Sequence, residues 1–356
     1  MTTRVREVIV SAIGEHGPIS FAGFMDLALY GPGGYYESPP VGETGDFVTN
    51  PHVHEIFAQL LGAAIRAWHL ALGGPSPLRL TEVGAGDGTL ARCLLAALAD
   101  IPLYYLAVER SSGARAMLTE IDGLHVAATL DDEPHVVLAH ELLDNLPFRR
   151  VRATDHGPKE VSVGFEGKRL VEVLTDPDDD LRAGAAGLEP GEETVYPDGA
   201  LAFIDELAKR LTHGYALLID YGAVGSPGGD PHGYRGHRLV EDMLAEPGTT
   251  DITAGVDFAL IAARAEARGL TAFPSVTQRH ALTALGFERW IRTELERQAK
   301  LLQDGAGNEA VRAWTGRSRA TLLVDPAALG RHRWLVLATP GLPAPDWLGS
   351  TERELG

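Results

Sequence analysis

The sequence has a single cysteine, Cys93, among its 356 residues. No internal disulfide is possible, so nothing in the chain requires an oxidising compartment. The sequence also lacks an apolar run of about 20 residues, the length that spans a bilayer. Its first residues include Glu7 and show no continuous hydrophobic stretch of the kind that signal peptides carry. We therefore expect a cytoplasmic protein without membrane insertion.

Basic residues are scarce, since 31 Lys and Arg stand against 49 Asp and Glu, a formal net charge of −18. General binding of nucleic acid needs a basic face that displaces counterions, so no nucleic-acid partner is expected. With 45% hydrophobic and 22% charged residues, the chain is too apolar to be disordered. Its length suits one large domain with additions, or two domains.

Strand-like and helix-like segments alternate after residue 75, which predicts an α/β fold with a parallel, Rossmann-like sheet. The alternation stops after Pro147 and returns near residue 200. We therefore expect a helical and loop extension over 1–75, a core over 76–341 and a tail over 342–356. Within the core, we expect an inserted β element at 148–197 and helical additions at 237–330.

A glycine turn, Glu82-Val-Gly-Ala-Gly-Asp-Gly, ends one predicted strand and opens a helix. Glycines permit positive φ and let backbone N–H groups approach a ligand closely. A dinucleotide site has Gly-x-Gly-x-x-Gly, and here the third glycine comes one residue too early. Gly84, Gly86 and Gly88 therefore favour S-adenosylmethionine, with Glu82 as an acceptor for its ammonium group. A dinucleotide site and a turn without a ligand remain as alternatives.

Four further residues are candidates for binding this cofactor. Glu109 ends the next strand, where an acid reads ribose hydroxyls. Asp131 follows the third strand and is either an acceptor for the adenine amine or part of a solvated loop. In the segment Gly45-Asp-Phe-Val-Thr, Asp46 offers an acceptor for the amino group or ribose and Thr49 offers a hydroxyl. The alternative for this segment is a loop that only packs.

Two acids, Glu141 and Asp144, follow the fourth strand in Glu141-Leu-Leu-Asp-Asn-Leu-Pro. The carboxyl ends of parallel strands form the ligand crevice of such a sheet, so this loop faces the methyl donor. A guanidinium stays protonated at neutral pH and needs a carboxylate to orient it and to accept a proton. We therefore expect Glu141 and Asp144 to be catalytic. The alternatives are that Asp144 caps a helix and that Glu141 contacts only the cofactor.

These motifs, in this order, resemble the MidA family, which includes a mitochondrial complex I assembly factor that methylates a protein arginine. The resemblance runs through nearly the whole chain, and further marks are Gly34-Tyr-Tyr, Asp251-Ile-Thr and Thr277-Gln278. It implies a seven-stranded class I methyltransferase core, a pocket partly roofed by the N-terminal loop, and a guanidino acceptor. This chain departs from the family pattern at His140, an asparagine in the family, and at Leu142 and Leu143, which are aromatic there.

Three functional hypotheses follow. The first is a methyltransferase that acts on an arginine of a partner protein. The second is a small-molecule O-methyltransferase of the same fold with His140 as its base, and the third is a non-catalytic assembly factor. No metal site is expected, because His52 and His54 lack a third ligand at a recognisable spacing. The insertion is suited to contact either a substrate protein or a second copy in a homodimer.

Overall fold

The structure, a computed structural model, describes residues 2–37, 49–225, 231–236 and 238–349. Its central sheet runs in the order β16 (Thr271–Ala272), β18 (Arg333–Ala338), β10 (Tyr215–Asp220), β5 (Val136–His140), β2 (Leu78–Val83), β3 (Leu103–Val108) and β4 (Leu124–Ala127). A short eighth strand, β17 (Val276–Thr277), also pairs with β18. From β4 to β10 all neighbours are parallel, and β18 is antiparallel to β10. This sheet confirms the Rossmann-like α/β prediction.

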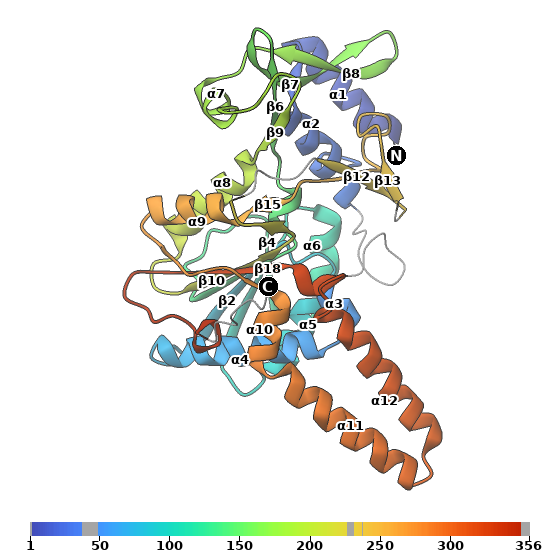
Figure 1. Cartoon of the computed structure of the whole chain (residues 1–356), viewed down its shortest axis with the longest axis vertical. Coiled ribbons are helices and arrows are strands. Elements are labelled where there is room, and N and C mark those ends of the chain that lie inside the picture. The colour runs from blue at the N-terminus through green and yellow to red at the C-terminus, as the bar shows by residue number, and fades with distance from the viewer. Residues whose placement is uncertain (1, 38–48, 226–230, 237, 350–356) are drawn as a thin grey trace.

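Alternate residues of the central strands face opposite layers of helices, because successive side chains of a strand point to opposite faces. On one face lie α4 (Ile56–Ala71), α5 (Thr89–Ala97) and α10 (Gln278–Leu285), packed against Leu138 and Leu217. On the other face lie α8 (Asp198–Arg210) and α9 (Phe258–Ala267), packed against Val137 and Leu218. Figure 1 shows the two layers above and below the sheet. Near the β4 edge of the sheet, α6 (Ser112–Leu118) packs against Ala107 of β3.

The N-terminal extension and the insertion form one smaller body. The extension contains α1 (Thr2–His16), β1 (Ile19–Ser20), α2 (Phe21–Met25), the π-helix η1 (Asp26–Tyr30) and the 3-10 turn η2 (Tyr35–Glu37). The insertion contains β6 (Arg149–Thr154), β7 (Gly157–Glu166), β8 (Arg169–Thr175) and β9 (Glu193–Tyr196). These strands and β1 make a second sheet. Phe21 and Phe24 of the extension share a core with Phe148 and Val163 of the insertion.

The insertion, expected as a β element, also contains a short helix, α7 (Asp179–Gly184). The carboxylate of Asp178 caps its first turn by accepting from the N–H of Leu181, 3.0 Å away, and Leu181 is buried. A capping aspartate and one buried leucine are enough to order this turn, although its surroundings are rich in acid, Gly and Pro.

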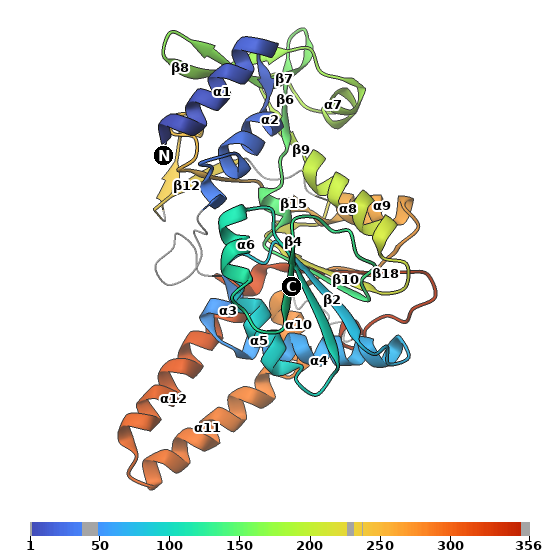
Figure 2. The ribbon, with the colours of Figure 1, turned by 180° about the vertical axis from the view of Figure 1, so that it is seen from behind.

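The region expected to hold helical additions also contains strands. A three-stranded sheet of β13 (Arg238–Val240), β12 (His232–Arg235) and β14 (Asp251–Thr253) lies beside the extension, and β11 (Gly222–Ala223) pairs with β15 (Val256–Asp257) (Figure 2). At the opposite end of the molecule, α11 (Phe287–Gln303) and α12 (Gly307–Ala320) project as an antiparallel pair (Figures 1 and 2). Short 3-10 turns complete the described chain: η3 (Leu143–Asn145), η4 (Thr321–Leu323), η5 (Leu329–Arg331) and η6 (Asp346–Leu348). No helix in these ranges is long and apolar enough to cross a bilayer.

Candidate active site

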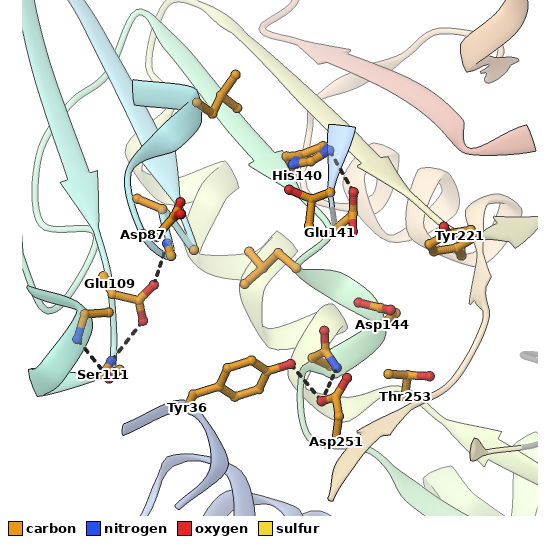
Figure 3. A pocket seen from close by; sticks show the side chains of 18 of the residues that line it. Tyr36, Asp87, Glu109, Ser111, His140, Glu141, Asp144, Tyr221, Asp251 and Thr253 are labelled. Atoms are coloured by element: carbon orange, nitrogen blue, oxygen red, sulfur yellow. Dashed lines mark hydrogen bonds and ion pairs between the residues drawn. The ribbon is translucent and has the colours of Figure 1, made fainter. Parts of the chain in front are cut away.

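A cleft of about 530 Å³ opens where the central parallel strands end (Figure 3). Its lining includes residues 84–87 after β2, Glu109 after β3, residues 141, 142, 144 and 145 after β5, and Tyr221 after β10. The N-terminal extension and β14 supply the opposite wall. Parallel strands bring their carboxyl ends to one edge of a sheet, which is why segments far apart in the sequence meet here.

The glycine turn takes a left-handed backbone at all three glycines, with φ of 77° at Gly84, 55° at Gly86 and 76° at Gly88. Gly84 and Gly86 line the cleft. Gly88 lies beneath the turn, where an added Cβ would collide with Ile121 and Leu118. Gly88 thus allows α5 to begin close to the α6 segment and does not face the cleft.

Glu82 lines the cleft although its side chain is almost entirely buried. Burial raises the pKa of this carboxyl to about 7, against the opposing effect of a hydrogen bond from the Tyr105 hydroxyl. That hydroxyl donates to Oε2 over 2.6 Å. Glu82 therefore changes its charge near neutral pH in the cofactor-free protein.

The two carboxylate oxygens of Glu109 each accept a hydrogen bond from a backbone N–H group. Its Oε2 accepts from the N–H of Gly86 at 3.0 Å, and its Oε1 accepts from the N–H of Ser111 at 2.9 Å (Figure 3). A carboxylate has about four lone-pair sites, so two acceptor positions remain for the ribose hydroxyls that the sequence prediction assigned to it.

Thr49, His52 and Asp87 form a hydrogen-bonded chain that we call the His52 relay. His52 lies on α3 (Asn50–Val53), and its Nε2 is 2.9 Å from Asp87 Oδ2. Its Nδ1 is 2.9 Å from Thr49 Oγ1. All three side chains line the cleft. Burial would raise the pKa of Asp87, but hydrogen bonds from His52 and Thr89 outweigh burial and lower it.

Glu141 begins the loop after β5 with a backbone φ of 50°. Residues other than glycine seldom adopt this left-handed conformation. Its N–H donates to the carbonyl of Ile219 at 2.8 Å, which fixes the backbone beside β10. Its Oε1 accepts from Asn50 Nδ2 at 3.2 Å. The strained backbone thus directs a carboxylate into the cleft.

A chain of amide hydrogen bonds leads from Trp334 to His140. Trp334 Nε1 donates to Gln278 Oε1 at 3.2 Å, so Gln278 Nε2 must donate to the carbonyl of Leu323 and to Asn50 Oδ1, at 2.9 and 2.6 Å. The Nδ2 of Asn50 then faces His140 Nε2 at 2.8 Å. The same Nε2 lies 3.1 Å from Glu141 Oε1, so Asn50 and Glu141 together hold the imidazole of His140 in place.

Asp220, fully buried at the end of β10, holds the loop that contains Asp144. Its Oδ2 accepts from the N–H groups of Leu142, Leu143 and Asp144, at 3.1, 2.8 and 3.3 Å. Burial, with the nearby charge of Glu141, raises the pKa of Asp220 to about 7. This carboxylate satisfies the backbone of η3 and keeps Asp144 at the cleft.

The Asp144 carboxylate lines the cleft, and its Oδ1 is buried without a hydrogen-bond partner in the described part of the chain. Burial raises the pKa of Asp144 well above its usual value, and the charges of Asp220 and Asp251 raise it further. Asp251, from β14, accepts from Tyr36 Oη at 2.8 Å and from Asn145 Nδ2 at 3.0 Å (Figure 3). A cation at this end of the cleft would relieve the excess negative charge.

The structure brings most sequence-predicted residues to this cleft, and their roles stay predictions. Those that line it are Thr49, Glu82, Gly84, Gly86, Glu109, Glu141 and Asp144. Asp131 does not, because its exposed carboxylate bonds to Thr129 and pairs with Arg210 at 3.4 Å. Asp46 lies outside the described residues. In the described ranges, no group of three or more His, Cys, Asp or Glu is arranged to hold a metal.

The sequence analysis assigned no role to Asp87, Asp251 or Tyr36, and none to Asn50. The sequence could have indicated a functional role for the first three, because each stands inside a motif that carries the family resemblance. Asn50 had none, since its partner Gln278 is 228 residues away in the chain.

Comparisons with known proteins agree with this geometry. The model of a family of S-adenosyl-L-methionine-dependent methyltransferases matches residues 60–276. The protein named "Protein arginine methyltransferase NDUFAF7, mitochondrial" of Rattus norvegicus is 30% identical over 89% of this chain and 80% of its own length. Its homolog in Drosophila melanogaster is 31% identical over 71% and 68%. A crystal structure of a Burkholderia thailandensis protein bound to S-adenosyl-homocysteine has 25% identity and a TM-score of 0.84, covering 98% of this chain and 95% of that one.

The expectation of a cytoplasmic protein is contradicted by the NDUFAF7 relatives, whose names place them in mitochondria. The expectation rested on low cysteine content and on the lack of long apolar runs. Both features are equally compatible with other reducing compartments, so neither could identify the cytoplasm.

Proposed function

Because the chain belongs to the MidA family of S-adenosylmethionine-dependent methyltransferases, we propose that it methylates an arginine guanidino group of a partner protein. Relatives similar over most of the chain are named protein arginine methyltransferases. One observation carries the proposal: the cleft presents the buried, unpaired oxygen of Asp144 beside Glu141 and Asp251.

The described residues fit the cofactor. Two left-handed glycines leave the turn open to a ligand, and Glu109 keeps acceptor positions at the end of β3. We assign Gly84, Gly86 and Glu109 to the adenosine side, and Glu82 and Thr49 to the amino-acid side. When bound, S-adenosylmethionine supplies a methyl group activated by a sulfonium.

The acidic end of the cleft suits a guanidinium. This group is planar, carries five N–H donors and stays charged at neutral pH. Asp144 and Glu141 offer carboxylate oxygens to its edges, and such bidentate pairs fix orientation as well as charge. A cation between these acids would lower the raised pKa of Asp144, so that the ionised carboxylate orients the guanidinium and accepts its proton.

The alternative of a small-molecule O-methyltransferase rests on His140 as a base. His140 Nε2, the nitrogen that would have to take the proton, already contacts Asn50 Nδ2 at 2.8 Å and Glu141 Oε1 at 3.1 Å. The geometry thus favours a positioning role for His140 and leaves proton acceptance to the carboxylates.

We keep the division of the chain as part of the proposal. The part of the extension 1–75 that precedes α4 would roof the cofactor site, while α4 packs against the central sheet. The core 76–341 would hold the cofactor, and the insertion 148–197 would meet the partner protein or a second copy. Tyr36 and Thr49, both in the cleft wall, support the role of the extension.

The proposal is tested by binding two peptides to the protein loaded with S-adenosyl-homocysteine. One is acetyl-Gly-Gly-Arg-Gly-Gly, and the other has citrulline in place of arginine, which keeps the shape and removes the charge. We expect the arginine peptide to bind about tenfold more tightly. Asp144→Asn should abolish the difference, whereas Asp155→Asn, in an exposed turn, should preserve it. Equal affinity of the wild-type protein for both peptides would contradict a guanidinium site.

A further inference from the structure

The His52 relay has no part in the proposed handling of arginine, although its three side chains line the cleft. Its Asp87 belongs to the glycine turn and lies away from Asp144 and Tyr221 (Figure 3). His52 Nε2 is 2.9 Å from Asp87 Oδ2, and His52 Nδ1 is 2.9 Å from Thr49 Oγ1.

The direction of each hydrogen bond follows from Asp87. Its Oδ1 accepts from the N–H of Thr89 at 3.0 Å, and its Oδ2 accepts from Thr89 Oγ1 at 2.9 Å, as an ionised carboxylate does. His52 Nε2 must therefore carry a proton and donate to Asp87. What remains variable is the proton on Nδ1, which faces Thr49.

The proton on His52 Nδ1 decides what Thr49 offers to the cleft. When His52 is neutral, Nδ1 accepts the hydroxyl hydrogen of Thr49. When His52 is charged, Nδ1 donates to Thr49 Oγ1, and the hydroxyl hydrogen is released toward a ligand. The charged relay thus presents a positive charge and an O–H donor beside the glycine turn.

The cleft needs such a group because its other ionisable lining is mostly acidic. Its described carboxylates are Glu82, Asp87, Glu109, Glu141, Asp144 and Asp251. S-adenosylmethionine and S-adenosyl-homocysteine each carry an α-carboxylate, an anion that this lining repels. The lining arginine, Arg331, lies over the Tyr221 ring at 5.3 Å, across the cleft from Asp87 (Figure 3).

We propose that Thr49 and protonated His52 form the subsite for the α-carboxylate of the methyl donor, with Asp87 as the counter-ion of His52. Glu82, across the same turn, takes the α-ammonium group. The charged groups that face His52 are Asp87 from the turn before α5 and Arg319 from α12, whose Nη2 donates to the His52 carbonyl at 3.1 Å. This inference depends on the cofactor alone and is independent of arginine as the acceptor.

A comparison of two ligands distinguishes binding at this subsite from binding at the rest of the cofactor site. S-adenosyl-homocysteine carries the amino acid, whereas 5′-methylthioadenosine keeps the adenosine and the sulfur and lacks the amino acid. Calorimetry at pH 6.5 measures both affinities for the wild-type protein and for His52→Gln, Thr49→Val and Thr49→Ser. The matched control is His156→Gln, at an exposed turn of the insertion.

We expect His52→Gln and Thr49→Val to weaken S-adenosyl-homocysteine about tenfold and to leave 5′-methylthioadenosine within about twofold. Thr49→Ser, which keeps the hydroxyl, should restore the affinity. An unchanged affinity for S-adenosyl-homocysteine, or an equal loss for both ligands, would overturn the subsite.

Discussion

Buried carboxylates dominate the electrostatics of the cleft. Glu82 and Asp220 are both almost fully removed from water, and burial raises the pKa of each to about 7. Asp220 uses its oxygens to hold the backbone of η3, whereas Glu82 has Tyr105 as its hydrogen-bond donor. Keeping such acids at the site costs stability, which a bound cation would restore.

Glu82 makes the stability of the cofactor-free protein depend on pH. Its folded pKa of about 7 lies above its ordinary value of 4.5, so the folded chain retains a proton that the unfolded chain loses over this interval. The contribution of Glu82 to the free energy of unfolding therefore falls as pH rises from about 4.5 to 7. Glu82→Gln removes this loss and keeps an acceptor for Tyr105.

We expect Glu82→Gln to be more stable than the wild type by about 2 kcal/mol at pH 8 and nearly equal to it at pH 5. Urea unfolding at the two pH values measures the difference. A difference of the same size at both would show that Glu82 does not take up a proton on folding.

At single positions, the sequence analysis identified residues whose place in the cleft follows directly from the strands that precede them. Glu82, Glu109 and Glu141 each stand at or just after the end of a predicted strand, and such ends meet at one edge of a parallel sheet. It did not reach Asn50, whose effect on His140 depends on an amide 228 residues away. It left Asp131 open between the adenine amine and a solvated loop, because the choice between the cleft and Arg210 depends on where α8 packs.

Among the elements, the glycine turn serves two purposes that the motif alone does not separate. Gly84 and Gly86 face the cleft, whereas Gly88 permits the close approach of α5 to Ile121 and Leu118. A substitution at Gly88 therefore tests packing, and one at Gly86 would test ligand access.

Gly88→Ala should lower the free energy of unfolding more than Gly167→Ala does. Both glycines have left-handed φ, 76° and 58°, so both variants pay the strain of an L-residue there, about 1 kcal/mol. At Gly167 nothing lies within 4 Å of an added Cβ, whereas at Gly88 two buried side chains must move. We expect an additional loss of about 1–2 kcal/mol for Gly88→Ala, measured by chemical denaturation. Equal losses would mean that α5 has room to shift.

Elements with strong periodicity were predictable, and short ones were not. The core strands carry continuous apolar runs, whereas β12 has four residues and β14 has three, and Ile252 of β14 packs in the core of the extension. The expectation of helical additions over 237–330 missed β14, which brings Asp251 to the cleft. No local pattern distinguishes such strands from loop, since their order comes from tertiary contacts.

In the whole molecule, two additions predicted as separate pieces share one core. Apolar residues of the extension and the insertion bury each other, because neither piece alone has a second layer to cover its apolar face. This body stands over the carboxyl edge of the central sheet and contributes Tyr36 to the cleft (Figure 1). The shared core could not be predicted, because its two parts lie far apart in the sequence. The central sheet could be predicted from the alternation of strands and helices.

The net charge of −18 and the carboxylates of the cleft point to the same class of substrate. An acidic surface attracts cationic partners and raises their encounter rate at low ionic strength. The cleft then selects among cations by geometry, since a guanidinium offers paired N–H groups to two carboxylates and an ammonium does not.

The most direct test is to identify the amino acid that receives the methyl group. Cells that lack this protein provide a lysate, which is incubated with the purified chain and S-adenosylmethionine carrying a labelled methyl group. The labelled proteins are then hydrolysed and their amino acids separated. We expect the label in methylarginine, and its loss with Asp144→Asn. Label in another amino acid, or in small molecules alone, would contradict arginine methylation.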